Sequence, residues 1–269
     1  MTRETVTTKQ ASVSAPGIIV HRDADVLAKA VAARIITRLV DAQSAKGSAS
    51  LVLTGGTVGI ATLAAIAATP ARDAVDWRRL DIWWGDERFL PAGDAERNET
   101  GAREALLDHV DVDPARVHVM RGPDSGMTAE ESAESYAAEL RAAARPEDHG
   151  PVPGFDVMLL GMGPDAHVAS LFPGLPALYD TRPVVAVHGS PKPPPTRISL
   201  TLPAIRAARE VWVVAAGEEK AGAVHLALSA SGPVQVPAAG ARGRQRTLFL
   251  LDRAAAGKIP PELGRLASP

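Results

Sequence analysis

The feature that most constrains the fold is a regular alternation of short apolar runs with longer stretches that have apolar residues at helical spacing. The short runs are rich in β-branched and aliphatic residues, as is typical of strands. They lie at residues 18–21, 51–54, 80–84, 117–120, 155–160, 184–187, 211–216 and 247–251. Ala-rich stretches with the periodicity of amphipathic helices separate most of them, at residues 24–39, 58–68, 129–144 and 218–228.

The strand runs are almost continuously apolar, which indicates burial on both faces of a sheet. We therefore predict an α/β fold with a doubly wound, mostly parallel sheet and helices on both faces, of the Rossmann-like kind. No shift in composition marks a domain boundary, so residues 17–269 are expected to form a single domain after a flexible segment at residues 1–16. Such sheets bind ligands at the carboxyl ends of their strands, and the segments that follow each strand are the candidate sites.

Composition excludes several classes of protein. The chain has no cysteine, which excludes a disulfide framework, a thiolate metal site and a cysteine nucleophile. Its 29 Lys and Arg residues are balanced by 31 Asp and Glu residues, so it lacks the bulk positive field of a nucleic-acid-binding protein. Neither a secretory signal nor a membrane-spanning stretch is evident. We expect a cytoplasmic protein that binds neither nucleic acid nor a membrane.

A glycine turn follows the second predicted strand, where Thr54, Gly55, Gly56 and Thr57 lead into a helix expected from about Val58. Adjacent glycines let backbone N–H groups turn toward a ligand at a helix N-terminus, which is a ready phosphate site. No Gly-Lys-Ser/Thr follows, so the turn is not a Walker loop. A strand-to-helix turn that needs glycine only for its backbone angles is an equal alternative.

A charged cluster follows the third predicted strand, where Asp86, Glu87 and Arg88 come directly after two tryptophans and Gly85. One interpretation is a solvated turn with an internal ion pair. The other is a site in which carboxylates position a cation opposite an anionic substrate. The pattern alone does not separate the two.

The strongest candidate for a catalytic segment follows the strand at residues 155–160, which runs into the glycine turn that contains Gly163. Pro164 comes next, at a point where proline would suit the first residue of a helix. Asp165 and His167 are then expected in the first turn of that helix. Because a helix N-terminus disfavours imidazolium, we expect His167 to be neutral and to serve as a general base.

The same segment also fits a dinucleotide-binding fingerprint through Gly161, Gly163 and Ala166. Two observations oppose that alternative. Asp165 would add negative charge where a pyrophosphate should lie, and Asp180, at about the right distance for the ribose contact, precedes its strand instead of ending it.

Two basic residues complete the candidate set. Arg197 lies just before a helix-like stretch, and Lys220 follows the strand at residues 211–216. Either residue alone would be a surface charge, but together with the glycine turn they could neutralise a phosphate dianion. The proline-rich residues 191–195 are interpreted as a stiff loop in preference to a polyproline ligand.

Taken in this order and spacing, the motifs resemble the 6-phosphogluconolactonase family over nearly the whole chain after about residue 16. They comprise Leu53–Thr57, Trp84–Arg88, Leu160–His167 with Ser170–Gly174, Arg197–Thr201 and Gly217–Ala221. The resemblance implies hydrolysis of a small molecule, 6-phosphogluconolactone, to 6-phosphogluconate in the oxidative pentose phosphate pathway. It also implies that no redox cofactor or metal is required. The oligomeric state is left open, with a monomer as the working expectation.

The resemblance also implies roles for individual residues. It places the catalytic group at His167 and a functional arginine at Arg88, and we expect Asp165 to orient His167. Arg88 or nearby N–H groups are expected to stabilise the oxyanion. The phosphate is expected to be held by Gly55, Gly56, Thr57, Arg197 and Lys220, with Asp86, Glu87 and Gly163 as further site residues.

The chain departs from the family pattern at two positions. Ala166 stands where the family usually has glycine, and Val168 replaces a common threonine. The first departure suggests that a positive φ is not essential at that position.

Two other functions compete with the lactonase. Glucosamine-6-phosphate deaminases have a similar fold and similar motifs, but they resemble Phe-Asn-Glu-Pro after the histidine, with a functional glutamate. This chain has Leu171, Phe172 and Pro173 there and no carboxylate, which disfavours aminosugar chemistry. A non-catalytic sugar-phosphate-binding protein is also disfavoured, because a sensor needs the phosphate clamp and not the base.

Overall fold

The structure, a computed structural model, describes residues 15–229, 231–260, 263 and 266–267. Most of the segment expected to be flexible, residues 1–14, lies outside the described residues. The strands are β1 Gly17–His21, β2 Ala49–Leu53, β3 Leu80–Trp84, β4 Asp86–Arg88, β5 Val157–Gly161, β6 Val184–Val187, β7 Arg197–Leu200, β8 Glu210–Ala215, β9 Arg246–Asp252 and β10 Leu266–Ala267. The helices are α1 Ala24–Lys46, α2 Gly56–Ala68, α3 Asn98–Ala105, α4 Ala129–Ala143, α5 Leu202–Ile205, α6 Ala221–Leu228 and α7 Pro237–Gly240.

The main sheet has the strand order β10-β1-β9-β8-β5-β2-β3 in the described part of the chain, and all of its neighbouring strands pair in parallel. Because the strands are parallel, their carboxyl ends meet at one edge. The loops after β2, β5 and β8 are therefore brought together there.

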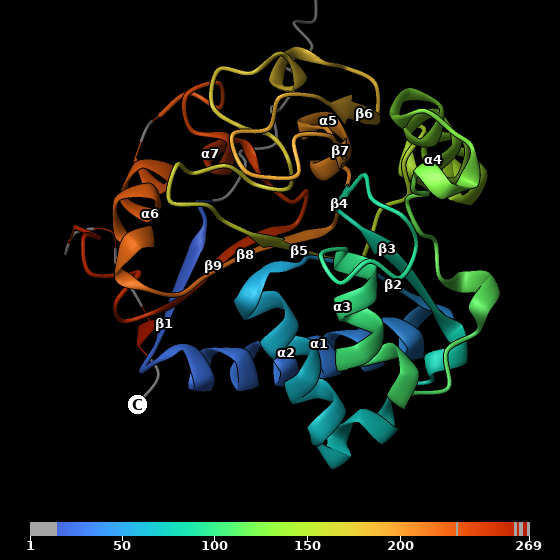
Figure 1. Cartoon of the computed structure of the whole chain (residues 1–269). Coiled ribbons are helices and arrows are strands. Elements are labelled where there is room, and N and C mark those ends of the chain that lie inside the picture. Colours follow the sequence, from blue (N-terminus) through green and yellow to red (C-terminus); the bar gives the residue numbers. More distant parts are fainter. Residues whose placement is uncertain (1–14, 230, 261–262, 264–265, 268–269) are drawn as a thin grey trace, which may run out of the picture.

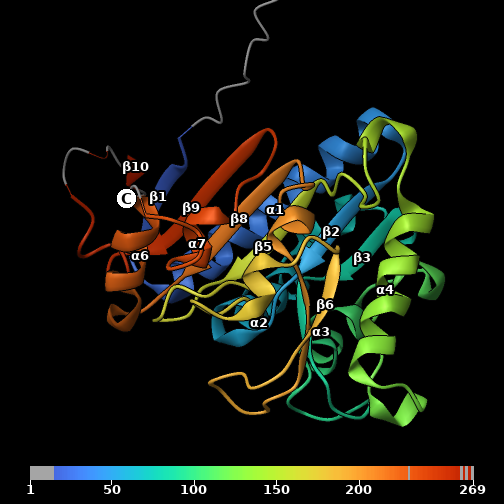
Figure 2. The ribbon, with the colours of Figure 1, turned by 90° about the horizontal axis from the view of Figure 1, so that it is seen from above.

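Alternate residues of the strands face two separate parts of the core. On β2, Leu51 and Leu53 pack with α1, α2 and α3, whereas Val52 packs with the part of the core that includes α4 to α7. Figure 1 shows α1, α2 and α3 below the sheet and the other helices above it. The view from above in Figure 2 separates α4, beside β3 and β6, from α6 and α7, which lie near β9. The predicted doubly wound α/β architecture is confirmed. None of the described helices is long and apolar enough to cross a membrane.

A second, antiparallel sheet of β4, β7 and β6 lies against the carboxyl end of the main sheet. The sequence did not predict this sheet: the cluster around Glu87 was interpreted as a turn or site, and Arg197 as a residue before a helix. In the observed register Arg88 lies opposite Arg197. A single residue, Gly85, separates β3 from β4. Its N–H donates to Leu53 O (3.2 Å), and its carbonyl accepts from Leu200 N (2.9 Å).

One predicted strand, at residues 117–120, is wrong. Only Val117 forms a bridge, to Ile82 of β3, and the rest of the segment is irregular. The Met120 carbonyl, which would extend a ladder, accepts a hydrogen bond from Arg97 Nη2 instead (2.7 Å). A side chain from another segment thus occupies a backbone carbonyl that a longer strand would use.

The four predicted helices are present with shifted bounds. The first begins at Ala24, where Asp23 caps it by accepting from Val26 N (2.8 Å), and it extends to Lys46, where Gly47 ends it in the left-handed region at φ 79°. The segment predicted as a helix from residue 218 begins as a 3₁₀ turn at Glu218–Lys220 and continues as α6.

Candidate active site

A pocket of about 270 Å³ lies at the carboxyl edge of the main sheet, where the small sheet approaches it. Loops after β2, β5 and β8 contribute to its wall, together with β4, β7, the start of α3 and the loop before β7. The lining residues are Thr54, Gly55, Gly56, Asp86, Arg88, Asn98, Gly161, Met162, Gly163, His167, Ala169, Lys192, Pro193, Arg197 and Lys220. Eight of the eleven residues predicted for the site therefore line one pocket. The other three are Thr57, Glu87 and Asp165.

The glycine turn lies at the start of α2, which begins at Gly56, two residues earlier than expected. Gly56 has φ +76°, a conformation that favours glycine, and a Cβ on Gly55 would overlap the side chain of Asn98. The helix has no side-chain N-cap and no acidic residue in its first turn. Its first N–H groups are therefore available to an anion in the pocket. Thr57 is exposed and lies outside the pocket lining.

The loop that follows β5 corrects the sequence interpretation, because residues 162–175 contain no helix. Pro164 does not begin a helix, and His167 does not lie in a first helical turn. Two backbone bonds close a tight turn instead: Ala166 N donates to Gly163 O (2.9 Å), and Gly163 N donates to His167 O (3.0 Å). The helix-dipole argument for a neutral imidazole therefore does not apply.

Ala166 has φ 64°, so a positive φ is used at this position. The inference drawn from the alanine, that a positive φ is not essential there, is thus wrong. Alanine tolerates the left-handed region at a cost of about 1–2 kcal/mol, which the turn around it has to offset. The residue is buried, and its carbonyl accepts from Ala238 N (3.0 Å), which helps to hold the turn.

The turn brings the Asp165 carboxylate to the His167 imidazole, with 2.5 Å between Oδ1 and Nδ1. Partial burial opposes ionisation of Asp165, but the hydrogen bond and the charge interaction with His167 outweigh it and lower its pKa to about 2. An ionised Asp165 accepts a hydrogen bond from Nδ1–H of His167 in the tautomer that leaves the Nε2 lone pair free to take a proton. The Phe172 ring packs beside the imidazole with 4.5 Å between centroids.

Gly163 has a spatial reason to be glycine. A Cβ there would overlap both the His167 ring and the Asp165 carboxylate. Any larger residue would have to displace this pair, so Gly163 supports the candidate base by leaving room for it.

Arg88 is held at the pocket by Asn98, a residue that the sequence reading missed. Arg88 Nη1 donates to Asn98 Oδ1 (2.9 Å) and to Glu96 O (2.7 Å), and Asn98 Nδ2 donates to Asp86 O (2.8 Å). Arg88 Nε is buried and has no hydrogen-bond partner among the described residues. Nothing in the spacing of Asn98 marks it as a site residue, since it enters the site only through the position of α3.

Asp86 connects this side of the pocket to the His167 loop. Its Oδ2 accepts from Ser170 Oγ (2.7 Å), and Ser170 N donates to Ser199 Oγ (3.1 Å). Three separate segments, the β4 strand, the β7 strand and the loop after His167, are tied together by these bonds.

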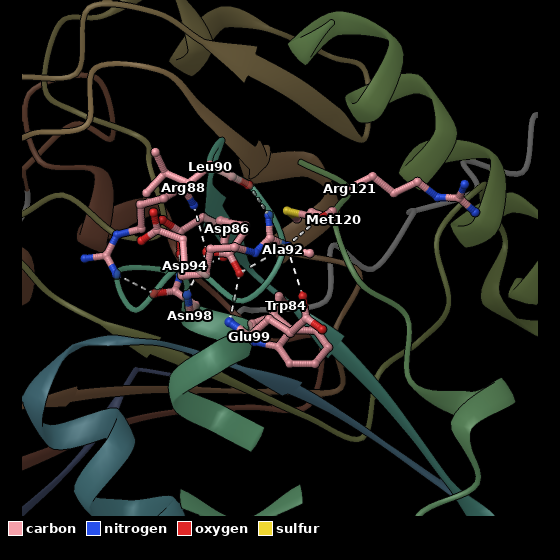
Figure 3. A network of polar contacts seen from close by, with 12 residues as sticks. Trp84, Asp86, Arg88, Leu90, Ala92, Asp94, Asn98, Glu99, Met120 and Arg121 are labelled. Carbon is pink, nitrogen blue, oxygen red and sulfur yellow. Dashed lines mark hydrogen bonds and ion pairs between the residues drawn. The ribbon is translucent and has the colours of Figure 1, made fainter. Parts of the chain in front are cut away.

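Glu87 belongs to a buried polar network and lies outside the pocket lining. Figure 3 shows other members of this network, among them Asp86, Asn98 and Glu99. Its carboxylate accepts from three backbone N–H groups, those of Arg88 (2.8 Å), Asn98 (2.7 Å) and Glu99 (2.8 Å), and so serves the N-terminus of α3. Burial raises its pKa to about 7 against the opposing effects of Arg97 and the backbone bonds. Its position indicates support of the site and not contact with a ligand.

Four basic side chains, Arg88, Arg197, Lys192 and Lys220, line the pocket. Burial lowers the pKa of Arg197 and of Lys220. The sequence reading missed Lys192, because residues 191–195 were considered only as a stiff loop. Among the described residues, no group of His, Asp and Glu has the arrangement of a metal site.

Comparison with known proteins agrees with a sugar-phosphate enzyme of this α/β type. The family described as glucosamine-6-phosphate isomerases/6-phosphogluconolactonase matches residues 22–250, and the chain belongs to this family. The 6-phosphogluconolactonase of Streptomyces coelicolor is 63% identical over 92% of this chain and 96% of its own. That of Mycobacterium tuberculosis is 49% identical over 90% of this chain and 98% of its own.

Solved structures support the same assignment of fold. The structure of 6-phosphogluconolactonase from Trypanosoma brucei superposes with a TM-score of 0.79 at 32% identity, covering 91% of this chain and 99% of that one. The structure of a monomeric glucosamine-6-phosphate deaminase has a TM-score of 0.73 at 20% identity, over 89% of this chain and 99% of that one. At this identity the similarity concerns the fold alone.

Proposed function

We propose that this chain hydrolyses 6-phospho-D-glucono-1,5-lactone to 6-phospho-D-gluconate, the lactonase step of the oxidative pentose phosphate pathway. The observation that carries the proposal is His167, which is hydrogen-bonded to Asp165 and lines a pocket that also holds four basic side chains. A base and an anion-binding wall in one pocket suit a phosphorylated ester. Relatives named 6-phosphogluconolactonase that align over nearly their whole length support the same substrate.

The proposed chemistry begins at His167. Nε2 takes a proton from a water molecule whose oxygen attacks the lactone carbonyl carbon, and Asp165 stabilises the imidazolium that forms. The tetrahedral oxyanion is stabilised by Arg88, whose orientation Asn98 sets. When the ring C–O bond breaks, His167 returns the proton to the leaving ring oxygen, which becomes the free hydroxyl of the product.

The phosphate serves as a remote handle that fixes the orientation of the ring. In this proposal the N–H groups of Gly55, Gly56 and Thr57 hold it at the start of α2. Arg197 and Lys220 supply the opposing positive charge. In this proposal the phosphate does not contact His167, so the binding energy it provides orients the ester without taking part in bond breaking.

The proposal extends to the organisation of the protein. Residues 17–269 act as one lactonase domain, since both sheets supply pocket residues. We further propose that the protein works as a cytoplasmic monomer on a small-molecule substrate; its membership in a family of sugar-phosphate enzymes supports the class of substrate.

The decisive test measures lactone loss with purified protein, corrected for spontaneous hydrolysis. We expect clear acceleration by the unchanged protein and a reduction of kcat by about 10²–10⁴-fold in His167→Ala, because a general base contributes about that much. The variant should fold normally, as judged by its thermal unfolding. Near-normal turnover in a folded His167→Ala protein would refute the assignment.

The competing deaminase activity is disfavoured by the residues after His167. Leu171 and Phe172 are buried, and Phe172 packs on the imidazole, so no carboxylate occupies this side of the ring. Release of ammonia from glucosamine 6-phosphate would overturn this conclusion.

A further inference from the structure

The loop between β6 and β7 places a lysine in the pocket wall. Lys192 and Pro193 both line the pocket, although the sequence suggested only a stiff connection there. Lys192 is exposed, and none of the described residues forms an ion pair with its ammonium group. Its charge is therefore available to a ligand.

The backbone that carries Lys192 is held by Arg197. Arg197 Nη2 donates to Lys192 O (3.1 Å) and to Pro193 O (3.0 Å), and Nε donates to Pro194 O (3.1 Å). A buried guanidinium thus binds three consecutive carbonyl groups of the loop, while its Nη1 remains for an anion. Neither a shorter side chain nor the single ammonium group of a lysine could make the same set of contacts.

The loop is also rigid by its own chemistry. Ser190 Oγ donates to Lys192 O (2.9 Å), and Ser190 N donates to Pro195 O (3.0 Å). Proline at positions 191, 193, 194 and 195 fixes φ on both sides of the lysine. Little backbone entropy is left to lose on binding, so the site is preorganised up to the lysine side chain.

Positive charge exceeds negative charge here, because four basic side chains and one carboxylate, that of Asp86, line the pocket. Burial lowers the pKa of Lys220, and the next contribution in the same direction comes from the charge of Lys192. Glu219 and Asp165 act on Lys220 in the opposite sense, but Asp165 is already bonded to His167. Across the small sheet, Arg88 lies opposite Arg197, a pairing of like charges that costs stability. A dianion bound beside Lys192, Arg197 and Lys220 would offset this excess of positive charge.

We propose that Lys192 binds the phosphate of the substrate, and that Arg197 positions the loop that carries Lys192 as well as facing the anion itself. This inference rests on the proposed function, because it takes the anion to be the phosphate of a sugar phosphate. The phosphate is thereby enclosed between the start of α2, Lys220 and the β6–β7 loop.

The test compares binding of 6-phosphogluconate to the unchanged protein and to Lys192→Gln by calorimetry. Loss of one charged contact to the phosphate should weaken binding about 10- to 100-fold. The KM for the lactone should rise in parallel while kcat changes by less than about 2-fold, because a contact to the phosphate is expected to bind the ground state and the transition state equally. Lys192→Arg should restore most of the affinity.

Lys258→Gln is the matched control, since Lys258 is exposed and lies outside the pocket lining. It should bind 6-phosphogluconate as the unchanged protein does. Unchanged affinity in Lys192→Gln would overturn the inference, and so would an equal loss of kcat, which would indicate a structural role of the loop. If the unchanged protein binds 6-phosphogluconate but does not accelerate lactone loss, the proposed function fails while the role of Lys192 is still decided by the binding data.

The positioning role of Arg197 needs a double-mutant cycle. Arg197→Lys keeps a positive charge but cannot bridge three carbonyl groups. If Arg197 holds the loop, Lys192→Gln should cost much less affinity in the Arg197→Lys protein than in the unchanged one. Equal losses in the two backgrounds would show that the residues act independently and would overturn this part of the inference.

Discussion

Two pairs of ionisable side chains in this protein, Glu87 with Arg97 and Asp165 with His167, differ in burial and in the distance between their partners. Glu87 and Arg97 are both about 2% exposed, and 3.8 Å separates Oε2 from Nη2. Asp165 is 36% exposed, His167 is 15% exposed, and their bonded atoms are 2.5 Å apart. The sequence predicted Glu87, Asp165 and His167 as site residues, but it did not point to Arg97. Burial separates the pair that supports the site from the pair that faces the ligand.

The largest expected effect comes from breaking the exposed pair. In Asp165→Asn the amide can donate to Nδ1, which moves the ring proton to Nε2 and removes the base. We expect kcat for the lactone to fall by about 10²–10⁴-fold with little change in thermal unfolding. Asp180→Asn is the matched control, because Asp180 forms a similar short-range pair, with Arg182. A kcat of Asp165→Asn within tenfold of the unchanged protein would contradict the role of this pair.

Breaking the buried pair should act on stability instead. Arg97→Met leaves Glu87 without its cation and two carbonyl groups, those of Leu90 and Met120, without their donor. The expected loss in the free energy of unfolding is about 3–5 kcal/mol, measured by urea denaturation. Arg103→Met removes a half-exposed partner of Glu99 and should cost less than about 1 kcal/mol. Equal losses in both variants would mean that burial is not what distinguishes the pairs.

The pH dependence of stability sharpens the comparison. Burial raises the pKa of Glu87 from 4.5 to about 7, so its contribution to stability is present below about pH 4.5 and is lost as the pH rises through 7. Asp165 titrates outside this window, because its pKa is lowered to about 2. We expect the free energy of unfolding to fall over this range in the unchanged protein, and to fall less steeply in Glu87→Gln. Identical slopes in urea titrations of the two proteins would exclude this role of Glu87.

The smallest effect is expected at the turn that presents His167. In Ala166→Gly the relief of the positive φ is opposed by the greater entropy of the unfolded chain and by the loss of a buried methyl group. The free energy of unfolding should therefore change by less than about 1 kcal/mol, and kcat should stay unchanged. Ala166→Val, with a β-branched side chain, should instead destabilise the turn and lower kcat. A stable, fully active valine variant would show that the turn does not depend on this backbone angle.

The main sheet could be predicted from the sequence because its evidence is local. Continuous apolar strands and helical spacing between them are sufficient for a doubly wound architecture, and the carboxyl-edge rule then locates the pocket. The strand predicted at residues 117–120 ends after its first contact with β3, and the Met120 carbonyl accepts from the Arg97 side chain, a contact that no local pattern reveals.

The small sheet could not be predicted, because its evidence is not local. Strand β4 has only three residues, too few to show an alternation, yet that alternation turns Asp86 and Arg88 to the pocket and Glu87 away from it. Asn98 and Lys192 reach the site through the placement of α3 and of the β6–β7 loop. The residues with chemical motifs of their own, above all His167, were the ones that sequence reasoning could find.

The junction at Gly85 has a mechanical consequence. Both of its backbone groups are bonded, one to the end of β2 and the other to β7, so the small sheet cannot slide along the edge of the large one without breaking these bonds. The backbone thereby fixes the distance between the basic side chains that line the pocket and the His167 imidazole. A phosphorylated sugar of different length could then contact either the basic side chains or the imidazole, but not both at once.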